Sequence, residues 1–180
     1  MAATLRLLAV VLGVLGLSAG AAEARQLLYT ADLRGDAPTS NTGSHATGQA
    51  RIVVDTDAQT VDITLDVTGM TIDNLWDTLV ARPIGPIHLH LYGAHNHMDP
   101  NANVSLVFPV PFGATYSVTP TGFHVSQQHA TYAWGAHLLG STTPFDQFLA
   151  SMNAGDVVFN IHTDAFHDGE ISGVVTPLGG

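Results

Sequence analysis

The sequence feature that most constrains the fold is a strict alternation of apolar and polar residues over positions 61–68. Four aliphatic residues alternate with four polar ones in the run Val61-Asp62-Ile63-Thr64-Leu65-Asp66-Val67-Thr68. Successive side chains of an extended chain point to opposite faces, so this period of two places all the aliphatic groups on one side. The pattern predicts a β-strand with one face in a core and the other in solvent.

Short strand-like segments of similar character recur along the chain, separated by the turn-forming residues Gly, Pro, Asn and Asp. They cover residues 26–33, 48–54, 86–93, 104–108, 123–126, 156–163 and 170–177. Such a series of short strands is typical of an antiparallel sandwich or barrel. We therefore expect an all-β protein built as an antiparallel β-sandwich.

One short helix and long loops complete the predicted architecture. In residues 143–155, Thr143 can cap a helix, Pro144 can occupy its first turn and Gly155 follows its last apolar residue. A helical turn is also expected near residues 73–80. Residues 94–141 have the weakest pattern, so long loops are expected there.

The first 24 residues have the composition of a secretory signal peptide. Arg6 precedes an apolar run over residues 7–17, and small residues follow up to an Ala-x-Ala site that ends at Ala24. The apolar run is shorter than the ~20 residues that a membrane-spanning helix needs, and no later segment qualifies. We expect cleavage near Ala24, export to the periplasm or the extracellular space, and one domain over residues 25–180.

The charge and cysteine content exclude several classes of protein. The chain has 15 acidic residues, five arginines and no lysine, with a net charge of −10. This balance repels phosphate backbones and anionic membrane surfaces, so nucleic acid is excluded as a partner. Cysteine is absent, so stability must come from packing, with or without a metal, and not from disulfides.

Three of the ten histidines form the best candidate site. His88 and His90 share one side of the predicted strand 86–93, and His162 lies near the end of strand 156–163. If these two strands are neighbours, three neutral imidazoles suit copper or zinc. A further ligand or a bracing partner would come from water or from His167, Glu170 or Asp164.

Two interpretations without a metal compete with this one. A histidine on a strand commonly hydrogen-bonds a carboxylate or a carbonyl, so His162 and Glu170 could brace the terminal hairpin as a purely structural motif. Alternatively, the chain is an interaction module whose loops between residues 93 and 141 contact another exported protein or a surface polymer. A solvent-facing apolar run over residues 107–112 would support that second interpretation.

The histidine-bearing segments also resemble a known family, the CHRD domain, which is named after chordin and found in many exported bacterial proteins. The resemblance lies in Pro86-Ile87-His88-Leu89-His90, in Phe159-Asn160-Ile161-His162-Thr163 and in Gly169-Glu170-Ile171-Ser172-Gly173, and it extends from about Leu27 to Pro177. It implies an immunoglobulin-like β-sandwich without established catalytic activity. Ser172 departs from the pattern, because the family usually has Arg there.

A more distant resemblance suggests an enzyme. Residues 85–93 are similar to the copper-ligand strand of copper-zinc superoxide dismutases, which are also exported sandwiches in bacteria. That family has a disulfide and an arginine beside the copper. This chain has no cysteine and no arginine after Arg82, so neither feature can form. The sequence therefore favours a non-catalytic, exported metal-binding domain over a superoxide dismutase-like enzyme.

Overall fold

The computed structural model describes residues 25–93 and 104–179. The predicted signal peptide lies outside the described residues. Within them, the chain forms ten antiparallel strands of one sheet, whose main path runs in the order β5-β4-β8-β9-β1-β2-β3-β7-β6, with β10 paired to β1. The strands are β1 (Gln26–Arg34), β2 (Thr47–Asp55), β3 (Thr60–Thr68), β4 (Ile87–Tyr92), β5 (Val104–Val110), β6 (Tyr116–Thr119), β7 (Gly122–Thr131), β8 (Val157–Ile161), β9 (Ile171–Val174) and β10 (Thr176–Pro177).

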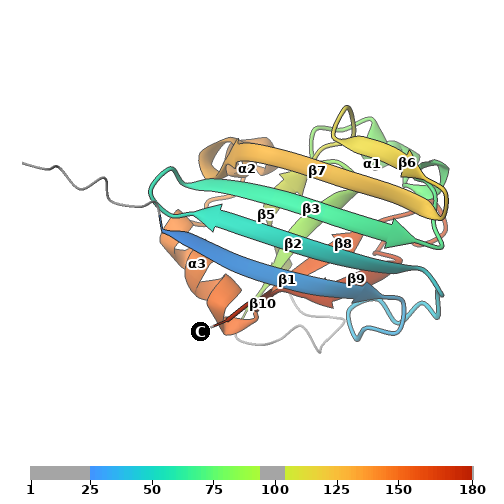
Figure 1. Ribbon diagram of the computed structural model, residues 1–180, viewed down its shortest axis with the longest axis horizontal. Helices are drawn as coiled ribbons and strands as arrows, with labels where there is room; N and C mark the ends of the chain where they lie inside the picture. Colours follow the sequence, from blue (N-terminus) through green and yellow to red (C-terminus); the bar gives the residue numbers. More distant parts are fainter. Residues whose placement is uncertain (1–24, 94–103, 180) are drawn as a thin grey trace, which may run out of the picture.

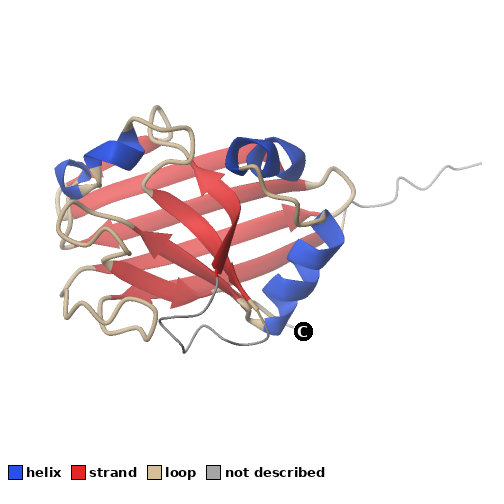
Figure 2. Cartoon of the chain, turned by 180° about the vertical axis from the view of Figure 1, so that it is seen from behind, coloured by secondary structure: helices blue, strands red, loops and turns tan. Residues whose placement is uncertain are grey.

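The sheet curls so that its two halves face each other. Strands β1, β2, β3 and β7 form one layer, and β5, β8 and β9 lie behind them (Figure 1). Seen from behind, the shorter strands of the second layer cross in front of the longer ones (Figure 2). The predicted all-β antiparallel sandwich is therefore confirmed, and its layers belong to one continuous curled sheet.

The core lies between the two layers. The predicted alternation over residues 61–68 is confirmed, because Val61, Ile63 and Leu65 on β3 are completely buried. They share one hydrophobic cluster with Leu89 of β4 and Phe159 of β8 in the opposite layer. Burial of these aliphatic and aromatic groups is the main favourable contribution to folding.

Short helices close the ends of the sandwich. Helix α3 (Phe145–Ala154) corresponds to the predicted helix, ends at Gly155 and buries Phe148 and Met152 in the core. The predicted cap was wrong, because Pro144 rather than Thr143 occupies the N-cap position and no side chain caps the helix. The predicted turn near residues 73–80 is a 3₁₀ turn, η1 (Ile72–Asn74), followed by α1 (Asp77–Val80). Helices α2 and α3 lie at one end and α1 lies toward the other (Figure 1).

The described part of residues 94–141 is more ordered than the sequence predicted. Besides the expected strands, it contains β6 and helix α2 (Tyr132–Leu139), which Thr131 caps by accepting a hydrogen bond from the backbone N–H of Trp134. Val107, Phe108 and Val110 are completely buried, so residues 107–112 do not form a solvent-facing apolar run. The short, largely apolar α2 has no amphipathic period by which the sequence could reveal it.

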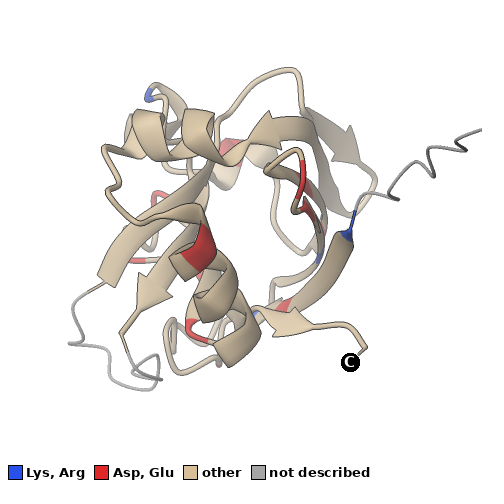
Figure 3. Cartoon of the chain, turned by 90° about the vertical axis from the view of Figure 1, so that its left-hand side faces the viewer, with Lys and Arg blue, Asp and Glu red and all other residues tan. Residues whose placement is uncertain are grey.

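The charges in the described residues are sparse and mostly acidic. Asp and Glu residues are scattered over several strands and loops, and the few basic positions lie apart from one another (Figure 3). Among the described residues, no helix is both long enough and apolar enough to cross a membrane.

Candidate metal centre

Three histidines meet on the side of β4 and β8 that faces away from the apolar core. His88 and His90 are two residues apart on β4, and His162 follows the last residue of β8. The two strands are antiparallel neighbours, and the backbone N–H of His162 donates to the carbonyl of Pro86 at 2.9 Å. The adjacency that the metal hypothesis required is therefore confirmed.

The three imidazole rings form a compact triangle. The ring centroid of His88 lies 4.8 Å from that of His90 and 4.5 Å from that of His162. The candidate ligand nitrogens of the three rings all lie within 4.8 Å of one another. Nitrogens bound tetrahedrally to one ion at ~2.0–2.1 Å would be about 3.3 Å apart. Binding of one ion would therefore need the nitrogens to approach one another and the rings to turn, because His88 stacks on His90 and on His162 with interplanar angles of 15° and 25°.

The histidines are buried although they lie on the outer side of their strands. Their exposed fractions are 3% for His88, 7% for His90 and 5% for His162. The sequence predicted an outer face or a rim for them, because Ile87 and Leu89 occupy the core side. The additional burial means that water cannot freely replace missing hydrogen-bond partners of these rings.

Backbone carbonyls set the tautomers of two rings. His88 Nδ1 lies 3.2 Å from the carbonyl oxygen of Gly85, and His162 Nδ1 lies 2.7 Å from that of His167. A carbonyl oxygen only accepts, so each Nδ1 must carry the proton and donate it. This leaves the lone pair on Nε2 in both rings, which is the arrangement that carbonyl partners impose on metal-bound histidines.

Several nitrogens of the cluster have no hydrogen-bond partner. Both ring nitrogens of His90 and Nε2 of His162 are buried and have no partner among residues 25–93 and 104–179. Most buried polar atoms in proteins are paired, and an unpaired one costs free energy, so such atoms need an explanation. A bound ion would engage lone pairs that otherwise destabilise the fold.

The cluster is uncharged at neutral pH. Burial, followed by the proximity of His90 and His162, lowers the pKa of His88 well below its ordinary value. Burial, followed by His162, lowers the pKa of His90 to about 3. Burial also lowers the pKa of His162, against the opposing effects of the His167 carbonyl and of Asp168. Neutral imidazoles are the form that binds a metal.

A tight loop after β8 holds His162 in place. Thr163 donates its hydroxyl to Glu170 at 2.7 Å, and Ser44 donates to the other oxygen of the same carboxylate at 2.6 Å. The backbone N–H of Glu170 donates a hydrogen bond to the carbonyl of Ile161 at 2.7 Å. The Thr163 and Glu170 pair therefore fixes the loop that presents His162.

Gly169 is required in this loop. Its φ is +116°, and a Cβ atom there would lie 2.1 Å from Oδ1 of Asn160. Asn160 in turn donates from Nδ2 to the carbonyl of Asp168 at 3.2 Å. One loop geometry therefore accounts for all the residues of this motif, which are Asn160, His162, Thr163, Gly169 and Glu170.

The other predicted ligands lie beside the triangle rather than in it. His167 contributes its backbone carbonyl to His162, while its ring stacks on Trp76 with centroids 4.2 Å apart. Asp164 accepts a hydrogen bond from the backbone N–H of Asp77 at 3.2 Å. The expected brace between His162 and Glu170 is not among the hydrogen bonds of the described residues, because Glu170 pairs with Ser44 and Thr163.

The structure adds two residues that the sequence did not assign to the site. Asn160 is opposite His88 in the strand register, and its buried Oδ1 has no hydrogen-bond partner in the described ranges of the chain. Its position two residues before His162 could have revealed that they share a face. The ring of Trp76 lies 6.5 Å from that of His162, and its backbone N–H donates to the His162 carbonyl at 3.1 Å. Trp76 comes from a distant turn and carries no such signal.

Comparisons with known proteins identify the family of this chain. No curated protein and no solved structure matches it. The profile of the CHRD domain matches residues 29–175, a range that includes β4, β8 and the loop from His162 to Glu170. The chain belongs to the CHRD domain family.

Proposed function

We propose that this protein is an exported, non-catalytic CHRD-domain protein that binds a copper or zinc ion through His88, His90 and His162. The observation that carries the proposal is the buried triangle of imidazoles, in which carbonyls direct the Nε2 lone pairs of His88 and His162 and both nitrogens of His90 have no partner among the described residues. Buried polar atoms without partners cost free energy, so binding of an ion to them has a clear energetic basis.

The donor set restricts the choice of ion. Imidazole nitrogen suits zinc and copper better than it suits magnesium or calcium, which prefer oxygen ligands. Three histidines leave one tetrahedral position for water or another group. Divalent copper binds nitrogen sites more tightly than zinc does, so copper should give the larger stabilisation in a direct comparison.

Elemental analysis tests the proposal. The protein without residues 1–24 is dialysed against copper or zinc, freed of excess ion and measured beside a His88→Ala/His90→Ala variant. About one equivalent of metal is expected in the wild type and a strong loss in the variant. His124→Ala, which removes a partly exposed histidine paired with Asp66, is the matched control. Equal metal content in all three proteins would refute the site.

Tryptophan fluorescence supplies a second readout. Trp76 lies beside His162, whereas the other tryptophan, Trp134, is on α2. A paramagnetic Cu²⁺ ion in the triangle should quench Trp76 at short range, so quenching should survive in Trp134→Phe and largely disappear in Trp76→Phe. The reverse pattern would place the copper elsewhere.

Export is the other part of the proposal and rests on the N-terminal sequence. Arg6, the apolar run over residues 7–17 and the site ending at Ala24 support cleavage by a signal peptidase. N-terminal sequencing of the protein recovered outside the cytoplasm of an expressing cell should begin at Arg25. Recovery of uncleaved protein from the cytoplasm alone would contradict it.

A further inference from the structure

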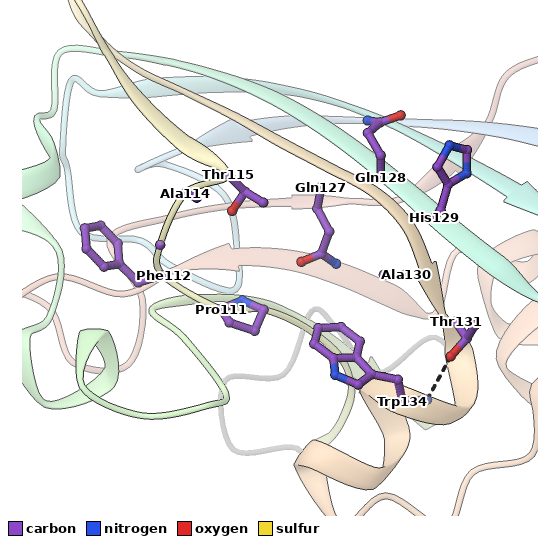
Figure 4. A pocket seen from close by; sticks show the side chains of 11 residues that line it. Pro111, Phe112, Ala114, Thr115, Gln127, Gln128, His129, Ala130, Thr131 and Trp134 are labelled. Carbon is purple, nitrogen blue, oxygen red and sulfur yellow. Dashed lines mark hydrogen bonds between the residues drawn. The ribbon is translucent and has the colours of Figure 1, made fainter.

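A groove of about 530 Å³ lies away from the histidine triangle, between the loop that joins β5 to β6, the end of β7 and the start of α2. Its walls include Pro111, Thr115, Gln127 and Trp134 (Figure 4). This volume is in the range of small-molecule sites, ~300–1,000 Å³. The groove falls within the region that the sequence suggested for contact with a partner or a surface polymer.

The lining of the groove carries no formal charge. None of the eleven lining residues is Asp, Glu, Lys or Arg, and His129 is the one histidine among them. In a chain with a net charge of −10, an uncharged groove is a distinct local environment. Its walls offer apolar surface together with amide and hydroxyl groups, which suits a neutral, hydroxyl-bearing ligand.

Gln127 breaks the apolar pattern of β7 at the groove. Phe123 and Val125 occupy the preceding inward positions and are completely buried, and Gln127 takes the next one with an exposed fraction of 5%. Its Nε2 donates to the carbonyl of Pro109 at 3.2 Å, which fixes the amide. The amide extends into the space between Pro111 and Trp134 (Figure 4). A buried amide costs free energy where an aliphatic group would fit. Departures from an apolar core pattern of this kind are common at functional sites.

The backbone beside Gln127 is also irregular. The pairing of β3 with β7 shifts register between Val61 and Ile63, and His129 adopts a φ of +54° although it is not glycine. The backbone N–H of His129 is held by the carboxylate of Asp62. Bulges that redirect side chains and strained non-glycine residues are both concentrated at binding sites.

Trp134 supplies a fixed aromatic surface at the edge of the groove. It is 40% exposed, unlike most large apolar residues of this protein. Its ring packs edge-on against Phe108 at 6.4 Å, and Thr131 caps its helix through the Trp134 backbone N–H. The electron-rich face of an indole attracts the slightly positive C–H groups on the face of a sugar ring.

We propose that this groove binds a neutral saccharide, with one sugar ring stacked on Trp134 and a hydroxyl bonded to the Gln127 amide. A proline-rich peptide is the main alternative for a groove with tryptophan and proline. Such peptides are gripped by several aromatic residues that form the groove. Two of the lining residues are aromatic, and only Trp134 is strongly exposed, because Phe112 is half-buried and packs against Tyr116. A buried, oriented amide also suits a hydroxyl better than a proline, which has no N–H to donate.

The test uses the full chain after export, with EDTA present so that the outcome does not depend on the metal proposal. Cellotetraose, maltotetraose, tetra-N-acetylchitotetraose and a decaproline peptide are titrated separately. Binding is followed by calorimetry and by the NMR signal of the Trp134 indole N–H. At least one of the sugars should bind saturably and shift this signal.

Variants assign the binding to the groove. Trp134→Ala and Gln127→Leu should each weaken sugar binding by about tenfold or more, as expected for central contacts. Trp134→Phe, which keeps an aromatic face, should retain much of it and so separates lost stacking from lost folding. Val118→Ala, at an exposed position on β6 outside the groove, is the control. No response to any sugar, binding of decaproline alone, or unchanged sugar affinity in Trp134→Ala would overturn the proposal.

Discussion

Replacement of His90 by leucine should stabilise the metal-free protein while abolishing its stabilisation by metal. His90 is 7% exposed, and neither of its ring nitrogens has a hydrogen-bond partner within the part of the chain that the structure describes. An unpaired buried polar group costs about 1–3 kcal/mol, and an apolar residue of similar volume removes that cost. The free energy of unfolding of His90→Leu should therefore exceed that of the wild type by about 1–3 kcal/mol.

The expected change is large enough to measure. For a domain of this size, 1 kcal/mol shifts the melting temperature by about 2–4 °C, so a gain of about 1–3 kcal/mol should make the metal-free variant melt roughly 2–12 °C higher. Copper at 100 times its Kd adds about 2.7 kcal/mol to the wild type through mass action. The variant lacks one of three ligands, so its melting temperature should change little when copper is added.

Thermal and urea unfolding with EDTA, and then with copper, provide the assay. His137→Leu changes an exposed histidine on α2 and should stay within about 0.5 kcal/mol of the wild type under both conditions. A metal-free His90→Leu protein that is less stable than the wild type would show that the ring makes favourable interactions, and would refute the argument from unpaired nitrogens.

Three further predictions concern pH and the His162 loop. Burial lowers the pKa of His90 to about 3 in the folded state, whereas an unfolded imidazole titrates near 6.5, so acid favours the unfolded state. As the pH falls from about 6 to about 4, the free energy of unfolding of the metal-free wild type should therefore drop by about 1.4 kcal/mol per pH unit relative to that of His90→Leu. Urea titrations that show a pH-independent difference between the two proteins would contradict this. Gly169→Ala places a Cβ against Asn160 at a φ of +116° and should lower the free energy of unfolding, measured in urea, by more than about 2 kcal/mol. Gly43→Ala, at a φ of +73° with open space around it, is the control and should lower it by less. Equal losses in the two variants would argue against the clash with Asn160. Thr163→Val leaves the Glu170 carboxylate without one donor and should lower the free energy of unfolding by about 1–3 kcal/mol. The same variant should bind copper more weakly. Unchanged copper binding would show that this loop does not hold His162 in place for the metal.

Local patterns in the sequence were sufficient for much of the fold. The alternation along β3 predicted which residues enter the core, because the two faces of a strand are decided by neighbours along the chain. Gly155 predicted the C-terminal end of α3 for a similar reason, since helix termini depend on a few adjacent residues, whereas the expected Thr143 cap was wrong because Pro144 is the N-cap residue. Helix α2 escaped prediction because it is short and largely apolar.

In the candidate site, too, the sequence predicted local features but not contacts between residues distant in the chain. That His88 and His90 share a face follows from their spacing alone, and the resemblance in the motif around His162 led to the correct family. The sequence could not establish that β4 pairs with β8, nor that the outer side of these strands is buried. It also did not reveal that Glu170 accepts hydrogen bonds from Thr163 and Ser44, the second of which is 126 residues away in the chain.

The sequence by itself therefore determined the strands, the sidedness of their residues and the three imidazole groups available for a metal. Only the tertiary structure decided that these groups meet, that the carbonyls of Gly85 and His167 direct two of the rings, and that the His90 ring has no hydrogen-bond partner among the residues described. The physical reason is that strand character depends on side chains a few residues apart. Pairing, burial and hydrogen-bond satisfaction depend on groups that are distant in the chain and become neighbours only when the sheet curls and closes.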